Sequence, residues 1–288
     1  MSTFLIITGA IFFFIFHLFL GNISYALINN LPHYSENSLN IKKGIINTKL
    51  SPFRHHKDKR EYHRLTSHVP IFGYMIHQNK KIKFFELKFA IFNMIILSMM
   101  FFFNRDFFIE MNIITLFFYL IFWSLIISLW NIVYIIDLRH YIIPDVINLL
   151  LFILSLLLWA FTCFFIYDKI IWMNIAVGLG IFIFFLFLGI VSGGGMGGGD
   201  VKFIISSGII FGNLIIFLIF ISSILGILYK TLLVPLFHLE KEKETPGDMN
   251  GKKTFPFGPF LIMASYIVLI FSQTFAIMLI KYIENVVR

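Results

Sequence analysis

The sequence predicts an all-α, polytopic integral membrane protein with about eight transmembrane helices. Hydrophobic residues make up 59% of the 288 residues and charged residues only 13%, about half the charged fraction of an ordinary soluble domain. Mean hydropathy is +0.88, and several apolar runs reach the roughly 20 residues that cross a bilayer core. These observations exclude a soluble globular fold. The single cysteine, Cys163, excludes a disulfide framework and a four-cysteine zinc site.

The net charge of +8 arises from one segment of the chain. Residues 29–88 hold twelve Lys or Arg and four acids, an excess equal to the charge of the whole chain. Cytoplasmic loops of membrane proteins retain Lys and Arg, and basic loops bind anionic lipid. We therefore expect a basic cytoplasmic loop with the lipid bilayer as its partner. The loop carries no nucleic-acid-binding motif, so nucleic acid is not an expected partner.

The apolar runs give the helices in order. The first run, about 3–28, lacks the positive start and small-residue cleavage site of a removed signal peptide and predicts a retained helix. If the basic loop is cytoplasmic, alternation places the amino and carboxyl termini outside. The remaining helices are expected at about 89–103, 112–136, 146–166, 171–191, 201–211, 214–228 and 259–280.

Three connections between these helices have distinct patterns. Asn104–Met111 is expected to form a short external turn, and Gly212 with Asn213 a tight external turn between the sixth and seventh helices. Residues 230–253 mix a charge cluster with Pro and Gly, which is typical of a loop, here a cytoplasmic one.

Three acids lie at the ends of predicted helices. Asp137 ends the third helix, Asp145 follows Pro144 at the start of the fourth, and Asp200 follows the glycine-rich run Gly193–Gly199. An ionisable group costs about 2.5 to 3.5 kcal/mol at mid-membrane on insertion scales, so each of these acids calls for a reason. Alternation of the helices places all three at the cytoplasmic face.

Spacing favours Asp137 and Asp200 as a catalytic pair. Asp137 and Asp145 are eight residues apart, about 12 Å along a continuous helix, which is too far to share a proton. Pro144 suits a helix start, so Asp145 fits better as a first-turn acid. Two close carboxylates can act as base on a water molecule and acid toward a peptide group. An ordinary acid at a helix end is the alternative for Asp137.

Two neighbours of Asp200 have open interpretations. Lys202 fits a residue that tunes the acidic pair or binds a substrate carbonyl, and equally a lysine that extends to the membrane surface. The glycine run lets a backbone approach closely, as an extended peptide substrate requires. A hinge is the alternative, and a phosphate-binding loop is weakly supported because no Gly-Lys-Ser/Thr ending follows.

Four separated segments resemble the type IV prepilin peptidase family, membrane aspartic proteases of the GxGD type. Gly197–Lys202 matches the family's Gly-x-Gly-Asp-x-Lys, and Ile136–Asp145 resembles its other acidic segment. Phe255–Leu261 matches the Pro-Phe-Gly-Pro entry to the last helix. Leu20–Pro32 resembles the end of the first helix, with Asn30 where Arg is usual. The four segments occur in the family's order over nearly the whole chain.

The resemblance implies an enzyme and assigns roles to residues. Asp137 and Asp200 would be catalytic, and Gly197, Gly199, Lys202 and Asp145 would bind substrate or support the site. The implied activity is a hydrolase of the cytoplasmic (inner) membrane, cutting type IV prepilins and the pseudopilins of type II secretion after a glycine at the cytoplasmic face. The domains would be the first transmembrane helix (1–28), the basic loop (29–88) and the peptidase (89–288).

The loop departs from the family pattern. Many family members also methylate the new amino terminus with S-adenosylmethionine, and their loop usually carries two Cys-x-x-Cys pairs, which this loop lacks. Methylation is therefore less secure than cleavage, and the residues that would hold S-adenosylmethionine are unassigned. Clustered histidines in a basic loop are more often solvated than metal-bound, so zinc is not expected at His55, His56, His63 and His68. Glu86 resembles an acidic position that follows the family's zinc region.

Three alternatives stay open on the sequence. One is a related GxGD peptidase without methyltransferase activity. The second is a proton-coupled transporter, although transporters place acids near mid-membrane at broken helices, whereas these acids lie at one face. The third is a scaffold of a secretion assembly in which both aspartates are structural.

Overall fold

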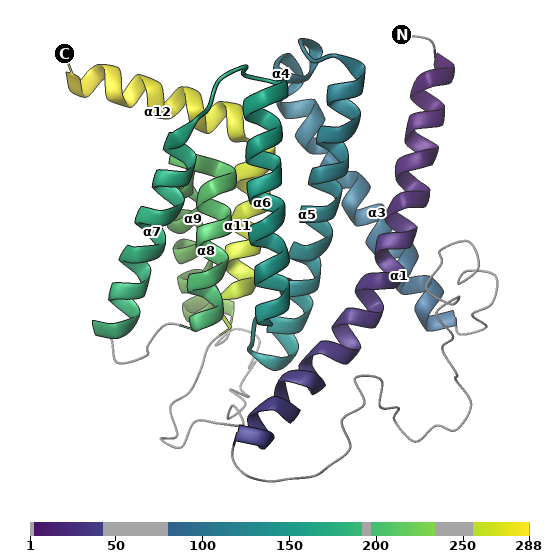
Figure 1. Cartoon of the computed structure of the whole chain (residues 1–288), viewed down its shortest axis with the longest axis vertical. Coiled ribbons are helices and arrows are strands. Elements are labelled where there is room, and N and C mark those ends of the chain that lie inside the picture. The colour runs from purple at the N-terminus through teal and green to yellow at the C-terminus, as the bar shows by residue number, and fades with distance from the viewer. Residues whose placement is uncertain (1–2, 43–79, 192–196, 234–255, 288) are drawn as a thin grey trace. The chain divides into compact units, whose positions relative to one another are not determined.

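The computed structural model describes residues 3–42, 80–191, 197–233 and 256–287. Every regular element in these ranges is a helix (Figure 1). The helices are α1 (Thr3–Lys42), α3 (Lys80–Phe103), α4 (Arg105–Ile109), α5 (Ile113–His140), α6 (Asp145–Phe165), α7 (Trp172–Val191), α8 (Gly198–Phe211), α9 (Ile215–Leu228), α11 (Gly258–Ile270) and α12 (Ser272–Val287). The 3-10 segment η2 (Gly212–Leu214) follows α8, and the π-helical segment η3 (Tyr229–Leu233) follows α9. The predicted all-α fold class is confirmed.

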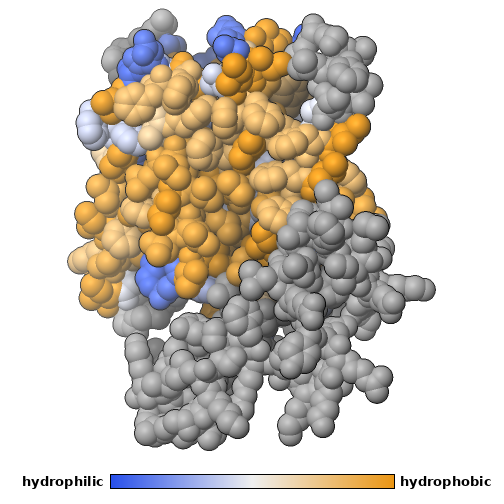
Figure 2. All heavy atoms as spheres, turned by 45° about the vertical axis from the view of Figure 1, so that its right-hand side comes forward, coloured by the Kyte–Doolittle hydropathy of each residue, from blue (hydrophilic) through white to orange (hydrophobic). Residues whose placement is uncertain are grey.

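The described helices identify a multipass membrane protein. Six are long and apolar enough to cross a bilayer: Gly9–Ile28, Phe85–Phe103, Ile113–His140, Asp145–Phe165, Trp172–Val191 and Gly198–Thr231. The pair α11 and α12 is a seventh candidate, bent by 81°. Figure 2 shows a face on which hydrophobic residues form a broad continuous band, with hydrophilic residues toward its ends. Such an apolar surface is stable against lipid and not against water.

The helices α8 and α9 form a hairpin within the longest candidate span. Ile143, just before α6, lies against both Gly199 at the start of α8 and Gly258 at the start of α11. At the end of α9, the ring of Tyr229 contacts that of Phe260 in α11, with centroids 5.3 Å apart. The start of α8 and the end of α9 therefore lie at the same end of the bundle, so the chain reverses at η2.

Gly212 makes this reversal feasible. Its φ is +52°, a backbone conformation that residues with a side chain rarely adopt. A Cβ there would also lie 2.6 Å from Oδ1 of Asn174. The tight turn predicted at Gly212 and Asn213 is thus present. Among the described residues there are thus six candidate spans, or seven with α11 and α12 as one, where the sequence predicts about eight, because Gly198–Thr231, which holds two predicted helices, counts as one span.

Several helix bounds differ from those predicted. The helix α1 continues to Lys42, beyond its apolar part, and α3 begins at Lys80 rather than at 89. The chain predicted as a turn after Asn104 contains the short helix α4. The helix α5 extends four residues past 136, and α8 begins at Gly198 rather than at 201. Apolar runs mark the lipid-embedded part of a helix, whereas the backbone hydrogen bonds continue into the polar residues beside it.

The last predicted helix, 259–280, is interrupted. The chain bends by 81° between α11 and α12, at Phe271. Asn104 binds two backbone groups and one side chain at this break: its Nδ2 donates to Ile270 O at 3.0 Å, and its Oδ1 accepts from Gln273 N at 3.2 Å and from Ser272 Oγ at 2.7 Å. A helix that bends inside an apolar environment needs such polar groups to satisfy its backbone.

The chain forms two compact units, residues 1–96 and 97–288. In the first unit α1 packs on α3: a Cβ on Gly21 would lie 3.2 Å from Cα of Glu86, and the side chains of His17 and Asn93 approach at 3.2 Å. Residues 43–79 of the predicted basic loop, with its four histidines, and residues 234–253 of the predicted second loop lie outside the described residues. The domain limits stay a prediction.

In the second unit α5 packs against α6 and α11. The indole of Trp130 contacts the rings of Phe211 and Tyr266, at 6.0 and 5.5 Å between centroids. The hydroxyl of Tyr266 also donates to Oδ1 of the buried Asn131 at 2.7 Å. Gly258, at the start of α11, lies against Asp137, near the end of α5, so the two helices run antiparallel and the end of α5 lies beside the start of α11. The candidate site lies there.

Candidate active site

Asp137 lies in the last turn of α5, with a side chain that is only 4% exposed. Tyr141 ends this helix in a left-handed conformation, with φ of 56°, and its backbone N–H donates to Asp137 O at 2.9 Å. A left-handed residue after the last turn is a common helix ending, usually supplied by glycine. The Oδ2 atom of Asp137 has no hydrogen-bond partner among the described residues. A buried carboxyl oxygen without a partner is unfavourable, so it calls for a reason beyond stability.

Asp200 lies in the first turn of α8, half-buried. Gly197 precedes the helix in an extended conformation, and its carbonyl accepts the first helical hydrogen bond, from Val201 N at 3.3 Å. The Asp200 carboxyl folds back toward this turn, because a Cβ on Gly197 would lie 2.8 Å from its Oδ2. A carboxylate in the first turn is favoured by the helix dipole. The last residues of the glycine run are thus helical, contrary to the prediction.

Ile143 and two glycines bring these aspartates to the same end of the second unit. A Cβ on Gly258 would lie 2.6 Å from Oδ2 of Asp137 and 3.2 Å from Cδ1 of Ile143, and a Cβ on Gly199 would lie 2.9 Å from Cβ of Ile143. The ends of α5, α6, α8 and α11 therefore meet with backbone in close contact. Asp137 borders Gly258, Asp200 follows Gly199, and both glycines lie against Ile143. The structure brings together the two acids predicted as a pair.

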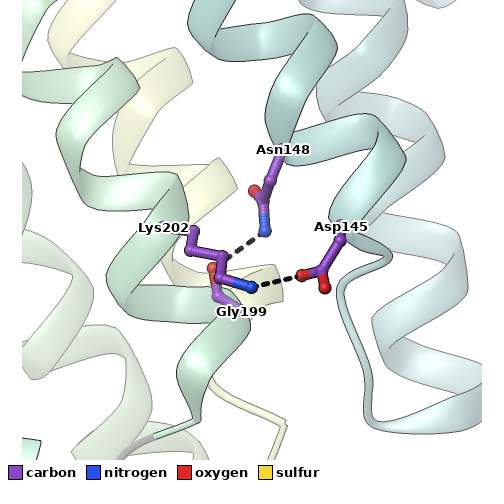
Figure 3. A network of polar contacts seen from close by, with 4 residues as sticks. All are labelled: Asp145, Asn148, Gly199 and Lys202. Carbon is purple, nitrogen blue, oxygen red and sulfur yellow. Dashed lines mark hydrogen bonds and ion pairs between the residues drawn. The ribbon is translucent and has the colours of Figure 1, made fainter.

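Asp145 and Lys202 form a separate ion pair at the rim of the site (Figure 3). Nζ of Lys202 donates to Oδ1 of Asp145 at 2.6 Å, and the side chains are 50% and 77% exposed. Asp145 occupies the first turn of α6, as its position after Pro144 predicts. An exposed pair of this kind contributes about 0 to 1 kcal/mol to stability. Its members link α6 to α8 at the surface.

The sequence reasoning missed Asn148. This residue lies one turn into α6, is 4% exposed, and its Nδ2 donates to Gly199 O at 3.1 Å (Figure 3). The available signal was a polar residue three positions after Asp145 in an otherwise apolar run, which places both side chains on one face of the helix. The contact of Gly258 with Asp137 was also missed, although Gly258 belongs to a segment that resembles the family.

The arrangement suits acid–base chemistry on a water molecule. Two carboxylates held close together favour a state with one shared proton, so that one acts as base and the other as acid. In the part of the chain that the structure describes, no three His, Cys, Asp or Glu residues are grouped as a metal site requires. The four loop histidines lie outside that part, so their expected lack of zinc stays a prediction.

Comparison with known proteins gives a match for the central part of this chain. The model of the type IV leader peptidase family matches residues 123–231. Neither the curated proteins nor the solved structures give a significant match. The matched residues include Asp137, Asp145 and Asp200 and run from α5 through α9. Residues 123–231 of this chain are therefore similar to the type IV leader peptidase family.

Proposed function

We propose that this protein is a membrane aspartic endopeptidase that removes the leader peptide of type IV prepilins or pseudopilins, cutting after a glycine at the cytoplasmic membrane face. The family match supports a leader peptidase in general terms. The observation that carries the proposal is that Asp137 and Asp200, from separate helices, lie at one end of the second unit around Ile143.

The reaction needs only these two carboxylates and one water molecule. The ionised carboxylate takes a proton from water as its oxygen attacks the carbonyl carbon of the glycine. The protonated carboxyl donates its proton to the carbonyl oxygen, which gives a tetrahedral diol. Transfer of a proton to the amide nitrogen then breaks the C–N bond and releases a carboxyl group and a new amino terminus.

The glycines beside the aspartates support access by an extended peptide. Gly197 and Gly198 are exposed, and a Cβ built on Gly198 meets nothing within 4 Å. The described residues therefore leave space directly beside Asp200. An extended chain can approach a backbone without side chains closely enough for main-chain hydrogen bonds.

The proposed orientation follows from charge. The basic loop faces the cytoplasm of a bacterial-type inner membrane, both termini lie outside, and alternation then brings the ends of α5 and α8 to the cytoplasmic face. The bilayer and the prepilin are the proposed partners. Capture of the basic leader is not assigned to the basic loop, because like charges repel.

Methylation of the new amino terminus is proposed as a separate activity, with S-adenosylmethionine as donor. The cleavage chemistry above does not depend on it, and zinc is not proposed as a cofactor. Mass spectrometry of the processed substrate, with and without S-adenosylmethionine, measures it directly. A product without the added methyl group would identify a peptidase that does not methylate.

The test of cleavage compares wild type with Asp137→Asn and Asp200→Asn in membranes, scored by the gel shift of a prepilin. Asp106→Asn is the matched control, because Asp106 is an exposed aspartate in α4, away from the site. We expect cleavage by wild type and control and none by the two site variants at equal expression. Near-normal cleavage by either site variant would show that its aspartate is structural and would contradict the mechanism.

A further inference from the structure

Asn148 contacts the short segment that carries Asp200. Its side chain reaches from α6 to the first turn of α8, where Nδ2 donates to Gly199 O at 3.1 Å (Figure 3). Gly199 is the residue directly before Asp200. The contact therefore acts on the backbone one peptide unit away from a proposed catalytic acid.

The chemistry of this contact fixes which way the amide faces. The two ends of an asparagine amide differ in hydrogen-bonding role, and a backbone carbonyl only accepts. The NH₂ end must therefore face Gly199 O, which leaves Oδ1 buried and without a hydrogen-bond partner among the described residues. An unsatisfied buried acceptor is unfavourable by about 1 to 3 kcal/mol. An apolar residue of similar size would avoid this loss, so the bond to Gly199 needs another reason than stability.

The start of α6 holds Gly199 from two directions. Ile143 packs so closely that a Cβ on Gly199 would lie 2.9 Å from its own Cβ, and Asn148 binds the carbonyl of the same residue. The packing stops Gly199 from moving toward Ile143, and the hydrogen bond stops it from moving away. A contact and a bond together restrain the first turn of α8 more than either does alone.

We infer that Asn148 is a positioning residue that holds Gly199, and through it the Asp200 carboxyl, in register with Asp137. This inference rests on the proposed function of the two aspartates. Asn148 takes no proton in this scheme, and its effect is on geometry. A displacement of about 1 Å in a catalytic group lowers rates by about 100-fold, so loss of the bond is expected to lower kcat by about 10- to 100-fold.

The test uses Asn148→Leu, which keeps the size of the side chain and removes the donor. Asn174→Leu is the matched control, because Nδ2 of Asn174 donates to Ile209 O at 3.2 Å, at the other end of the same helix α8. Both variants lose one asparagine bond to an α8 carbonyl, and the melting temperature of each measures what that loss does to stability apart from catalysis. Only Asn148→Leu is expected to lower kcat, with KM within about twofold of wild type. Asn148→Gln, which restores an amide donor, is expected to regain most of kcat.

Kinetic results contradict the inference in three cases. The first is an unchanged kcat for Asn148→Leu, and the second is a fall in kcat for Asn174→Leu equal to that for Asn148→Leu. The third is a failure of Asn148→Gln to regain activity, which would attribute the loss of kcat in Asn148→Leu to packing. All rates are taken well below the melting temperature and per amount of folded protein.

Hydrogen exchange in the full-length protein tests the inference without activity. Asn148→Leu is expected to speed exchange at the amides of Val201 and Lys202, in the first turn of α8, and Asn174→Leu is not. If wild type cuts no prepilin, the proposed function fails, but the exchange rates still show whether Asn148 holds the first turn of α8. Unchanged exchange at Val201 would overturn the inference even if wild type is an active peptidase.

Discussion

Replacing Gly258 with alanine places a methyl group where the Asp137 carboxyl now lies. The added Cβ would be 2.6 Å from Oδ2 of Asp137, and ordinary contact begins at about 3.4 Å, so the oxygen must retreat by about 0.8 Å. Ile143 Cδ1, at 3.2 Å from the same Cβ, limits the alternative movements. Overpacking of this kind is unfavourable by about 1 to 3 kcal/mol, and a displacement near 1 Å lowers rates by about 100-fold. We expect kcat/KM for prepilin cleavage to fall by about 10- to 100-fold.

The control for this prediction is the same substitution at an open position. A Cβ on Gly180 in α7 meets nothing within 4 Å, so Gly180→Ala should cleave at close to the wild-type rate. The assay measures initial rates in membranes with matched amounts of each variant. If Gly258→Ala and Gly180→Ala cleave equally well, the close contact between Gly258 and Asp137 has no bearing on catalysis and the reasoning is refuted.

Two further predictions concern stability and are read from melting temperatures in detergent. Asn104→Ala should lower the melting temperature more than Ser272→Ala, because Asn104 binds several backbone groups at the helix break. Each buried group left unsatisfied costs about 1 to 3 kcal/mol. Equal falls in melting temperature would contradict this role. Gly208→Ala should destabilise by about 1 to 3 kcal/mol, because its Cβ would lie 2.6 Å from Cα of Gly178 and force α7 and α8 apart. Gly189→Ala, with nothing within 4 Å, should leave the melting temperature unchanged, and a similar loss in both variants would exclude helix spacing as the cause.

The hydropathy of the chain was enough to predict its membrane helices, including the turn at Gly212. It was not enough to predict helix ends, because the polar residues beside an apolar run can continue the helix, as residues 137–140 do. The break between α11 and α12 has no local signal: Phe271 is apolar, and the residue that supports the bend, Asn104, is 167 positions earlier in the chain. Distant partners of this kind are set by tertiary packing.

The candidate site shows the same division. Asp137 and Asp200 could be selected from sequence because an acid next to a membrane span is rare and needs a reason. The residues that pack around these acids could not be selected in this way, since an isoleucine and a glycine such as Ile143 and Gly258 occur at the end of any apolar helix. Helices that face lipid on one side and protein on the other are apolar all round, so hydropathy does not reveal which residues touch. Asn148 was the exception, a polar residue whose position in α6 carried information that was not used.

The brevity of the α8–α9 hairpin bears on how water reaches the aspartates. Fourteen residues of helix are about 21 Å long, whereas the hydrocarbon core of a bilayer is roughly 30 Å thick. Lipid must thin around so short an element, or polar groups and water must enter at its ends. Hydrolysis consumes one water molecule per peptide bond, and Asp200 lies at an end of this hairpin. A bilayer thicker than this hairpin would therefore leave Asp200 at a level that water can reach.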